Sequence, residues 1–217
     1  MMKIYYIVFA LFVFSSCKKS GVAIDNGCIS EIKRQSFGVT AADSIAAVQL
    51  LTQNHLPTND LQFEYIRLHD TVTTNGTTNV YQYIFAVEYL NGLPVLSYDF
   101  GYTFKNNVFQ QVTGARYDAI TLNTHSTQSL PRLRELYMTE VSKNGTTIVN
   151  FKDSCVVAQF GYYDMNVDFN VLTNDHTPNF VKAWSVKPKH AWYPQVIFRD
   201  DDGKTIIYNT GPVLLNQ

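Results

Sequence analysis

Hydrophobic side chains recur at a helical spacing in two segments of this chain. The first segment begins at Thr40, which stands three residues before Asp43, the spacing of a helix-capping box. We expect this helix to end near Asn54, ahead of Pro57. Its apolar face would carry Ile45, Val48, Leu50 and Leu51.

The second helical segment begins after Ser129, which can cap it. Pro131 falls in its first turn, where the missing N–H of proline costs nothing. The pair Asn144-Gly145 predicts the end of this helix. Its apolar face would carry Leu133, Leu136, Tyr137 and Val141.

Strands are predicted after each helix, because apolar and polar residues alternate there. After the first helix we expect Gln62–Asp70, Val80–Leu90, Leu93–Phe104 and Val108–Val112. After the second helix we expect Cys155–Tyr163, Phe180–Val186, Gln195–Arg199 and Thr205–Tyr208. Turn residues predict a loop at Asn75-Gly76, a hairpin at Asn91-Gly92, and turns at Lys105–Asn107 and Asp202-Gly203.

The order of one helix and four strands occurs twice. It predicts an α+β fold of two units, each a helix lying on an antiparallel sheet. The units end alike, with Phe104-Lys105 before Thr113-Gly114 and Phe198-Arg199 before Thr210-Gly211, which suggests an internal duplication. The alternative is one larger sheet with both helices on one face. We expect the units at residues 39–124 and 125–217.

The first residues show a different pattern, with Lys3 followed by an unbroken apolar run from Ile4 to Phe14 and then small residues. This is typical of a secretory signal peptide. The run is about half of the ~20 residues that a membrane-spanning helix needs, so we do not expect it to remain as an anchor.

Cys17 directly follows the small residues and resembles the lipobox cysteine of bacterial lipoproteins, with Phe14 in the place usual for leucine. This resemblance implies removal of residues 1–16, a lipid on Cys17, and a lipidated tether at residues 17–38. Lys18 is not the aspartate that retains some lipoproteins in the inner membrane. We therefore expect the outer membrane, with the chain facing either the periplasm or the outside.

Charge and composition narrow the class of partner. The chain has 17 Lys and Arg against 18 Asp and Glu, and its basic residues are scattered, so we expect no nucleic-acid partner. Charged residues make up 16% of the chain, below the roughly 25% typical of soluble proteins. Tyr and Phe number 14 each, which favours sheet surfaces.

The chain has three cysteines, and lipidation of Cys17 would leave Cys28 and Cys155. An even remainder in an exported chain favours a disulfide between these two, although two unrelated buried thiols are the alternative. Cys28 lies in a polar segment with no accompanying histidine motif. We do not expect it to be a catalytic nucleophile.

The sequence shows no motif of a known catalytic or metal site. Zinc-site spacing, Walker loops and G-x-S-x-G are all missing. Asp200–Gly203 fails the other positions of a calcium loop, so we expect an acidic turn there. We predict no enzyme activity, no metal and no cofactor. The five histidines are isolated in the sequence: His55, His69, His125, His176 and His190.

Aromatic residues gather in the second half, at Tyr162-Tyr163, Trp184 and Trp192-Tyr193. Neighbours on a strand face opposite sides, so one residue of each pair should reach solvent or a partner. We predict a partner surface made of Tyr163, Trp184, Trp192 and Tyr193. A covering helix or loop is the alternative.

Two sets of segments resemble parts of metalloprotease propeptides. Tyr81-Gln82-Tyr83, Asn91–Val95, and Phe104–Asn107 followed by Gly114 resemble the fungalysin/thermolysin propeptide motif, although Asn106-Asn107 replaces the usual Asp-Gly. Ala183–Val186, Val196–Phe198 and Asp202–Lys204 resemble a PepSY domain. The resemblance spans roughly Val39 to Gly211 and implies a cystatin/PepSY-like fold. We expect no protease domain to follow, so the resemblance implies a propeptide-type module that stands alone.

These features predict a lipid-anchored cell-envelope protein that acts as a non-catalytic binding module and restrains or chaperones an envelope peptidase. Exposed sheet edges at Gln62–Asp70 and Cys155–Tyr163 are the expected means of binding. The alternative is a surface lipoprotein that binds a glycan or small ligand through the aromatic face. The expected partners are thus the membrane, through the lipid, and an envelope peptidase.

Overall fold

The computed structural model describes residues 28–35, 37–97, 100–114, 116–117, 120–144, 155–167 and 177–211. The predicted signal peptide, Cys17 and His176 lie outside these residues. The described part is an α+β fold with two helices and two largely antiparallel sheets. Neither helix in this part is long and apolar enough to cross a membrane.

The first helix, α1 (Ala41–Gln53), has the predicted capping box. Thr40 Oγ1 accepts from the Asp43 N–H at 3.1 Å, and the Asp43 carboxylate accepts from the Thr40 N–H at 3.3 Å. The helix ends at Asn54, as predicted.

The apolar face predicted for α1 is partly wrong. The buried residues are Ala47, Leu50 and Leu51, whereas Ile45 and Val48 are 60% and 38% exposed. The contact face is therefore centred on Ala47, whose small side chain lets the helix lie close to the sheet.

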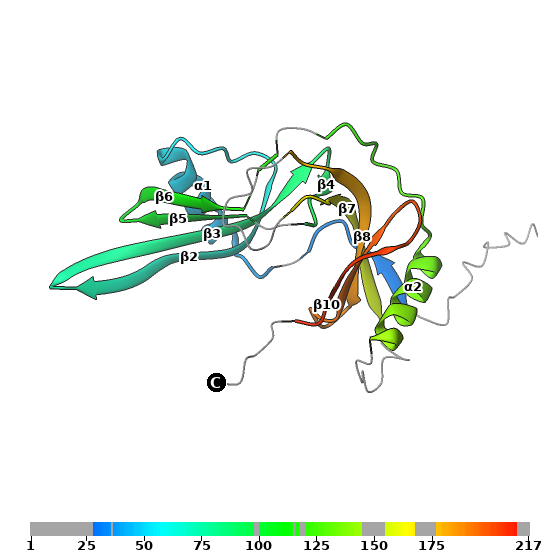
Figure 1. The fold of residues 1–217 in the computed structure, drawn as a ribbon. Coiled ribbons are helices and arrows are strands. Elements are labelled where there is room, and N and C mark those ends of the chain that lie inside the picture. The colour runs from blue at the N-terminus through cyan, green and yellow to red at the C-terminus, as the bar shows by residue number, and fades with distance from the viewer. Residues whose placement is uncertain are drawn as a thin grey trace, which may run out of the picture.

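The first sheet is a meander in the order β2-β3-β5-β6, with α1 on one face (Figure 1). Its strands are β2 (Leu61–Thr74), β3 (Thr77–Leu90), β5 (Phe100–Lys105) and β6 (Val108–Thr113), while β4 (Leu93–Pro94) pairs with β3. Asn75-Gly76 forms a tight hairpin turn with both φ angles positive, rather than a loop. The hairpins at Asn91-Gly92 and Asn106-Asn107 are as predicted.

The strand predicted over Leu93–Phe104 is divided into β4 and β5. After Pro94 the chain turns towards the second sheet, where Val95 bridges to Tyr162 and the Leu96 N–H donates to the Tyr162 carbonyl at 2.7 Å. Tertiary pairing has therefore overridden the local strand pattern.

The second sheet has α2 (Leu130–Lys143) on one face, capped by Ser129 and ended at Asn144 as predicted. Leu133, Tyr137 and Val141 of α2 pack on Trp184 and Phe198 in a buried cluster. The sheet order is β1-β7-β8-β9-β10. Its strands are β1 (Ile29–Glu31), β7 (Val156–Asp164), β8 (Phe180–Pro188), β9 (Gln195–Arg199) and β10 (Thr205–Asn209).

β1 changes the predicted tether at residues 17–38. Ile29–Glu31 pairs in parallel with Val156–Ala158, so the chain starts in the second sheet before it builds the first. The structure contains the predicted disulfide Cys28–Cys155 immediately beside this pairing. A strand of three residues is too short to give a recognisable alternation, which explains why sequence analysis missed it.

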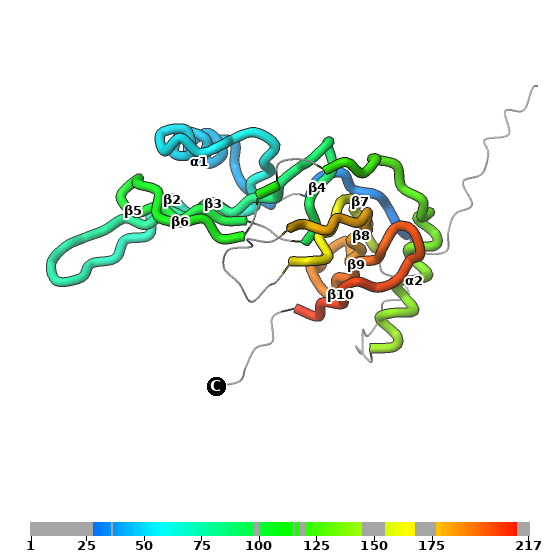
Figure 2. The backbone as a smooth tube through the Cα atoms, turned by 45° about the horizontal axis from the view of Figure 1, so that its top comes forward, coloured from blue at the N-terminus to red at the C-terminus, as the bar shows by residue number. Residues whose placement is uncertain are grey.

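The molecule is elongated, with the two sheets at opposite ends (Figure 2). The two separate sheets exclude the alternative of one continuous sheet. The hairpin of β2 and β3 projects as an arm, because β3 pairs with β5 only over Tyr81–Ala86.

Candidate functional site

A cleft of about 460 Å³ opens where the two sheets meet. Each helix covers one face of its sheet, and the cleft lies on the opposite faces. In β7 and β8, for example, Phe160 and Trp184 pack in the cluster under α2, whereas the alternate residues Gln159 and Lys187 line the cleft. The cleft thus joins the uncovered faces of both sheets.

Amide side chains cross the floor of this cleft in one connected network. Gln35 Nε2 donates to Gln159 Oε1 at 2.9 Å, and Lys187 Nζ donates to Gln35 Oε1 at 2.8 Å. Gln62 Nε2 donates to the Gln35 carbonyl, and Tyr89 OH donates to Gln62 Oε1 at 2.7 Å. Because Gln62 and Tyr89 belong to the first sheet, this network ties the sheets together across the cleft.

The wall of the cleft is aromatic. Trp192 and Tyr193 are 53% and 40% exposed and line it together with Tyr163. Lys187 Nζ lies 3.8 Å from the centroid of the Trp192 ring, a cation–π distance. The Phe37 ring stacks with the Trp192 ring at 6.1 Å, with an interplanar angle of 8°.

Of the predicted partner surface, Trp192 and Tyr193 are exposed on the cleft. Tyr163 also lines the cleft but is only 3% exposed, and Trp184 is 2% exposed under α2 on the other face of the sheet. The alternation along β8 carried a signal for this, since Trp184 and Val186 alternate with the polar Ser185 and Lys187.

Tyr163 has a strongly perturbed hydroxyl. Burial raises its pKa to about 12, and the negative charge of Asp164 adds to the effect. A raised pKa stabilises the fold below the unfolded value near 10, and that stability is lost as the pH rises through the folded value.

We therefore expect Tyr163→Phe to remove part of the alkaline sensitivity. Between pH 9 and pH 12 the wild type should lose about 2 to 3 kcal/mol more unfolding free energy than the variant. Urea denaturation at several pH values measures this difference. Tyr65→Phe, at a site that is 47% exposed, is the matched control, and an equal effect of both variants would contradict the prediction.

The described residues show no group of three or more His, Cys, Asp or Glu side chains that could hold a metal ion. The four described histidines, His55, His69, His125 and His190, are all exposed. In the cleft the acidic and basic lining residues are Glu64 and Lys187, and Lys187 is held by Gln35 and Trp192.

The predicted acidic turn is a structural element. Asp200 is fully buried and accepts from the Thr127 and Gln128 backbone N–H groups. Asp201 pairs with Arg199, and Asp202 pairs with Lys204. These protein partners account for the three carboxylates without a bound metal ion.

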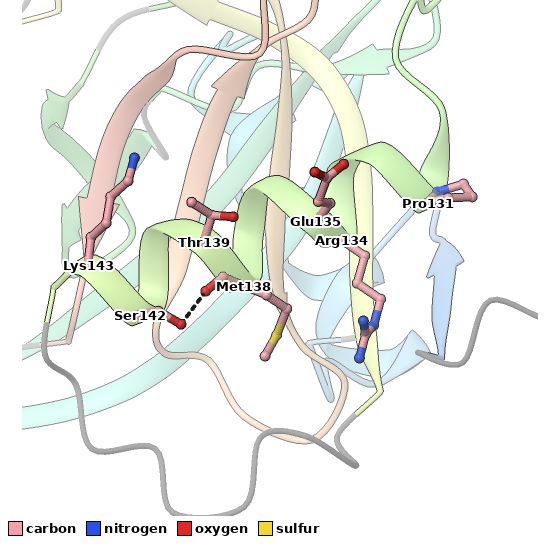
Figure 3. Close-up of a pocket in the computed structure, with 7 residues that line it drawn as sticks. All are labelled: Pro131, Arg134, Glu135, Met138, Thr139, Ser142 and Lys143. Carbon is pink, nitrogen blue, oxygen red and sulfur yellow. Dashed lines mark hydrogen bonds between the residues drawn. The ribbon is translucent and has the colours of Figure 1, made fainter.

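A second depression lies along the outer face of α2 (Figure 3). Its described lining runs from Pro131 to Lys143 and comes from this one helix. Ser142 Oγ donates to the Met138 carbonyl at 2.7 Å, and Glu135 pairs with Arg132. Because groups from separate elements do not converge there within the described residues, the cleft between the sheets is the better candidate site.

The sheet edges differ from those expected. The predicted edge Cys155–Tyr163 is wrong, because β7 is paired with β8 on one side and with β1 and Val95 on the other. β2 is an edge as predicted, but two register shifts interrupt it. β10 is also an edge, and its Ile207 and Asn209 line the cleft.

The amide network was not predicted from the sequence. Gln35 stands in the segment expected to be a tether, and isolated glutamines on strands give no recognisable pattern.

Comparisons with protein-family models, with curated proteins and with solved structures found no match.

Proposed function

We propose that this chain is a lipid-anchored protein of the cell envelope, attached to the outer membrane through Cys17, that acts as a non-catalytic binding module. Its ligand is an extended segment of a partner protein, bound in the cleft between the sheets. An envelope peptidase that the module restrains or chaperones is the partner we favour, following the resemblance to protease propeptides.

The observation that carries this proposal is the position of the open edge of β10 beside the cleft. β10 is the last strand of its sheet, and its Ile207 and Asn209 face the cleft. An extended peptide can pair its backbone with such an edge while alternate side chains enter the cleft. The Gln195 side chain donates to Ser185 Oγ, and the Asn209 side chain accepts from the Gly211 N–H. The side-chain oxygen of Gln195 and the side-chain NH₂ of Asn209 can still accept from and donate to a peptide backbone.

The two units share one order of elements, which supports an internal duplication and a cystatin/PepSY-like arrangement for each. In both, a helix is followed by a four-stranded meander, β2-β3-β5-β6 after α1 and β7-β8-β9-β10 after α2. This kinship is a likeness of fold, and fold alone does not fix function.

A glycan stacked on the aromatic face is the alternative, and the cleft geometry favours it less. The ring of Trp192 is already engaged by Lys187 and by Phe37. A sugar that stacks on the indole would compete with these contacts.

The test is site-specific photo-crosslinking. A photoreactive amino acid is placed at Asn209, beside the cleft, in the full-length protein in native envelopes. The control position is Gln111, an exposed residue of β6 in the other sheet. We expect one partner protein to be crosslinked at least about tenfold more from position 209 than from position 111, through one extended segment.

Equal crosslinking from both positions, or none from position 209, would contradict the proposal. If the partner is a peptidase, its activity is then measured with and without the purified protein, and unchanged activity removes the restraining role. Crosslinking of glycan fragments alone from position 209 would favour the alternative, a glycan-binding lipoprotein.

A further inference from the structure

Residues Ile32–Gln35 and Phe37, which we call the strap, cross from β1 in the second sheet towards α1 in the first unit. The strap forms part of the cleft lining through Gln35 and Phe37. It contacts both sheets, and Lys33 and Gln35 each contact both.

The strap is attached to the second sheet by backbone and side-chain contacts. The Ile32 N–H donates to the Ala158 carbonyl at 2.9 Å, and Gln159 Nε2 donates to the Lys33 carbonyl at 3.3 Å. At its far end Phe37 stacks on Trp192.

The strap also holds the first sheet. The Tyr89 hydroxyl, which donates to Gln62, also lies 3.3 Å from the Lys33 carbonyl, and the Arg34 guanidinium lies 4.8 Å from the centroid of the Tyr89 ring. The backbone carbonyl of Gln35 accepts from Gln62 in the first sheet, and its side-chain amide donates to Gln159 in the second sheet. Gln35 therefore bridges the two sheets.

The near end of the strap depends on very little secondary structure. β1 pairs with β7 over three residues, Ile29–Glu31, at the edge of the sheet. Short edge elements open locally at a small fraction of the global stability. The Cys28–Cys155 disulfide lies directly beside this pairing, where the Val156 N–H donates to the Cys28 carbonyl at 2.8 Å. Cys28 is exposed and therefore accessible to a reductant.

We propose that the Cys28–Cys155 disulfide is a redox latch for the strap, and that its reduction frees β1 and the strap and opens the wall of the cleft. A dithiol attacks one sulfur of the bond, and its second thiol resolves the mixed disulfide. Its two electrons and two protons end on the thiols of Cys28 and Cys155, and it leaves as its own disulfide. The regulatory meaning rests on the proposed binding in the cleft, whereas the latch itself can be tested without a ligand.

The test compares hydrogen exchange in the oxidised full-length protein and after reduction with dithiothreitol. We expect the amides of the β1 and strap segment to exchange at least about tenfold faster after reduction, while β8 keeps its protection. The double variant Cys28→Ser with Cys155→Ser should match the reduced protein and should not respond to dithiothreitol. Unchanged exchange in the strap, or loss of protection in β8 as well, would overturn the latch.

A second variant keeps the disulfide and so does not depend on the reduced fold. Phe37→Ala removes the ring that stacks on Trp192. Because Trp184 is buried, acrylamide quenching of fluorescence reports mainly on Trp192. We expect acrylamide quenching to rise both in this oxidised variant and in the reduced wild type. Hydrogen exchange of the Ile32 amide should rise only in the reduced wild type. No rise in quenching in either protein would show that the strap does not wall the cleft.

These readouts separate the two proposals. A latch that opens as described while position 209 crosslinks no partner would reject the proposed function and keep the latch. If position 209 crosslinks a partner but hydrogen exchange in the strap is identical in both redox states, the proposed function is kept and the latch is rejected.

Discussion

Replacing Asp200 with alanine is expected to lower the free energy of unfolding by about 3 to 5 kcal/mol, the cost of breaking a buried charged network. Asp200 accepts from the backbone N–H groups of Thr127 and Gln128 at 2.9 and 3.1 Å and from Trp184 Nε1 at 3.0 Å. Lys182 Nζ lies 3.4 Å from the same carboxylate. Removal of the carboxylate leaves these donors without their acceptor in a site closed to water.

Urea denaturation near neutral pH measures this loss. The matched control is Asp201→Ala, because the Asp201 side chain is 62% exposed and pairs with Arg199 at the surface. Surface pairs contribute about 0 to 1 kcal/mol, so the control should change little. Equal losses at positions 200 and 201 would contradict the structural role of Asp200.

The same variant should change how stability depends on acid. Burial of the Asp200 carboxyl raises its pKa, but the hydrogen bonds from Thr127, Gln128 and Trp184 outweigh burial and hold the pKa below its usual range. The stabilising effect is therefore present above an unfolded pKa of about 3.9 and is lost as the pH falls through the folded value. We expect the stability difference between wild type and Asp200→Ala to shrink below about pH 4.

Gly161→Ala is expected to destabilise the protein by about 1 to 3 kcal/mol through overpacking where the two sheets meet. A Cβ at this position would overlap the carbonyl oxygen of Pro94 and come within 2.8 Å of Leu96 Cγ. Backbone atoms cannot move aside as a side chain can, so β7 and the segment after β4 must separate. Faster hydrogen exchange at the Leu96 amide, which donates to the Tyr162 carbonyl, would accompany the loss of stability.

Gly101→Ala provides the comparison. A Cβ at Gly101 would come within 2.6 Å of the Phe85 ring, which can rotate away because it is a side chain on a half-buried face. We expect a smaller loss than at Gly161, and no change in exchange at Leu96. A larger effect at Gly101 than at Gly161 would contradict the tight approach of the two sheets.

The elements that sequence analysis placed well depend on local chemistry. Thr40 with Asp43, and Ser129 with Asn144, are capping residues that act within one helical turn, so both helices begin and end where predicted. The turn residues Asn91-Gly92 also act locally.

The elements that were missed depend on distant partners. β5 is separated from β4 because Val95 pairs with Tyr162, which lies in the other sheet. β1 exists because Ile29–Glu31 finds β7 across more than half of the chain. Local propensity carries no information on such pairings.

The candidate site was half predicted for the same reason. The gathering of aromatic residues in the sequence brought Tyr163, Trp192 and Tyr193 to notice, and all three line the cleft. It could not bring in Gln35 or Gln62, because their roles arise only when the strap lies across both sheets.

The pairing of β1 with β7 has a consequence for the order in which the protein can be built. A nascent chain emerges from its N-terminus, so β1 and Cys28 appear first, and their partners in β7 appear only after the whole first unit. During that interval β1 has no partner strand, while the first sheet offers the edge of β2. The register shifts between Phe63 and Tyr65 and between Arg67 and Asp70 interrupt that edge. Interrupted edges are poor templates for pairing, and this leaves β1 available until β7 arrives.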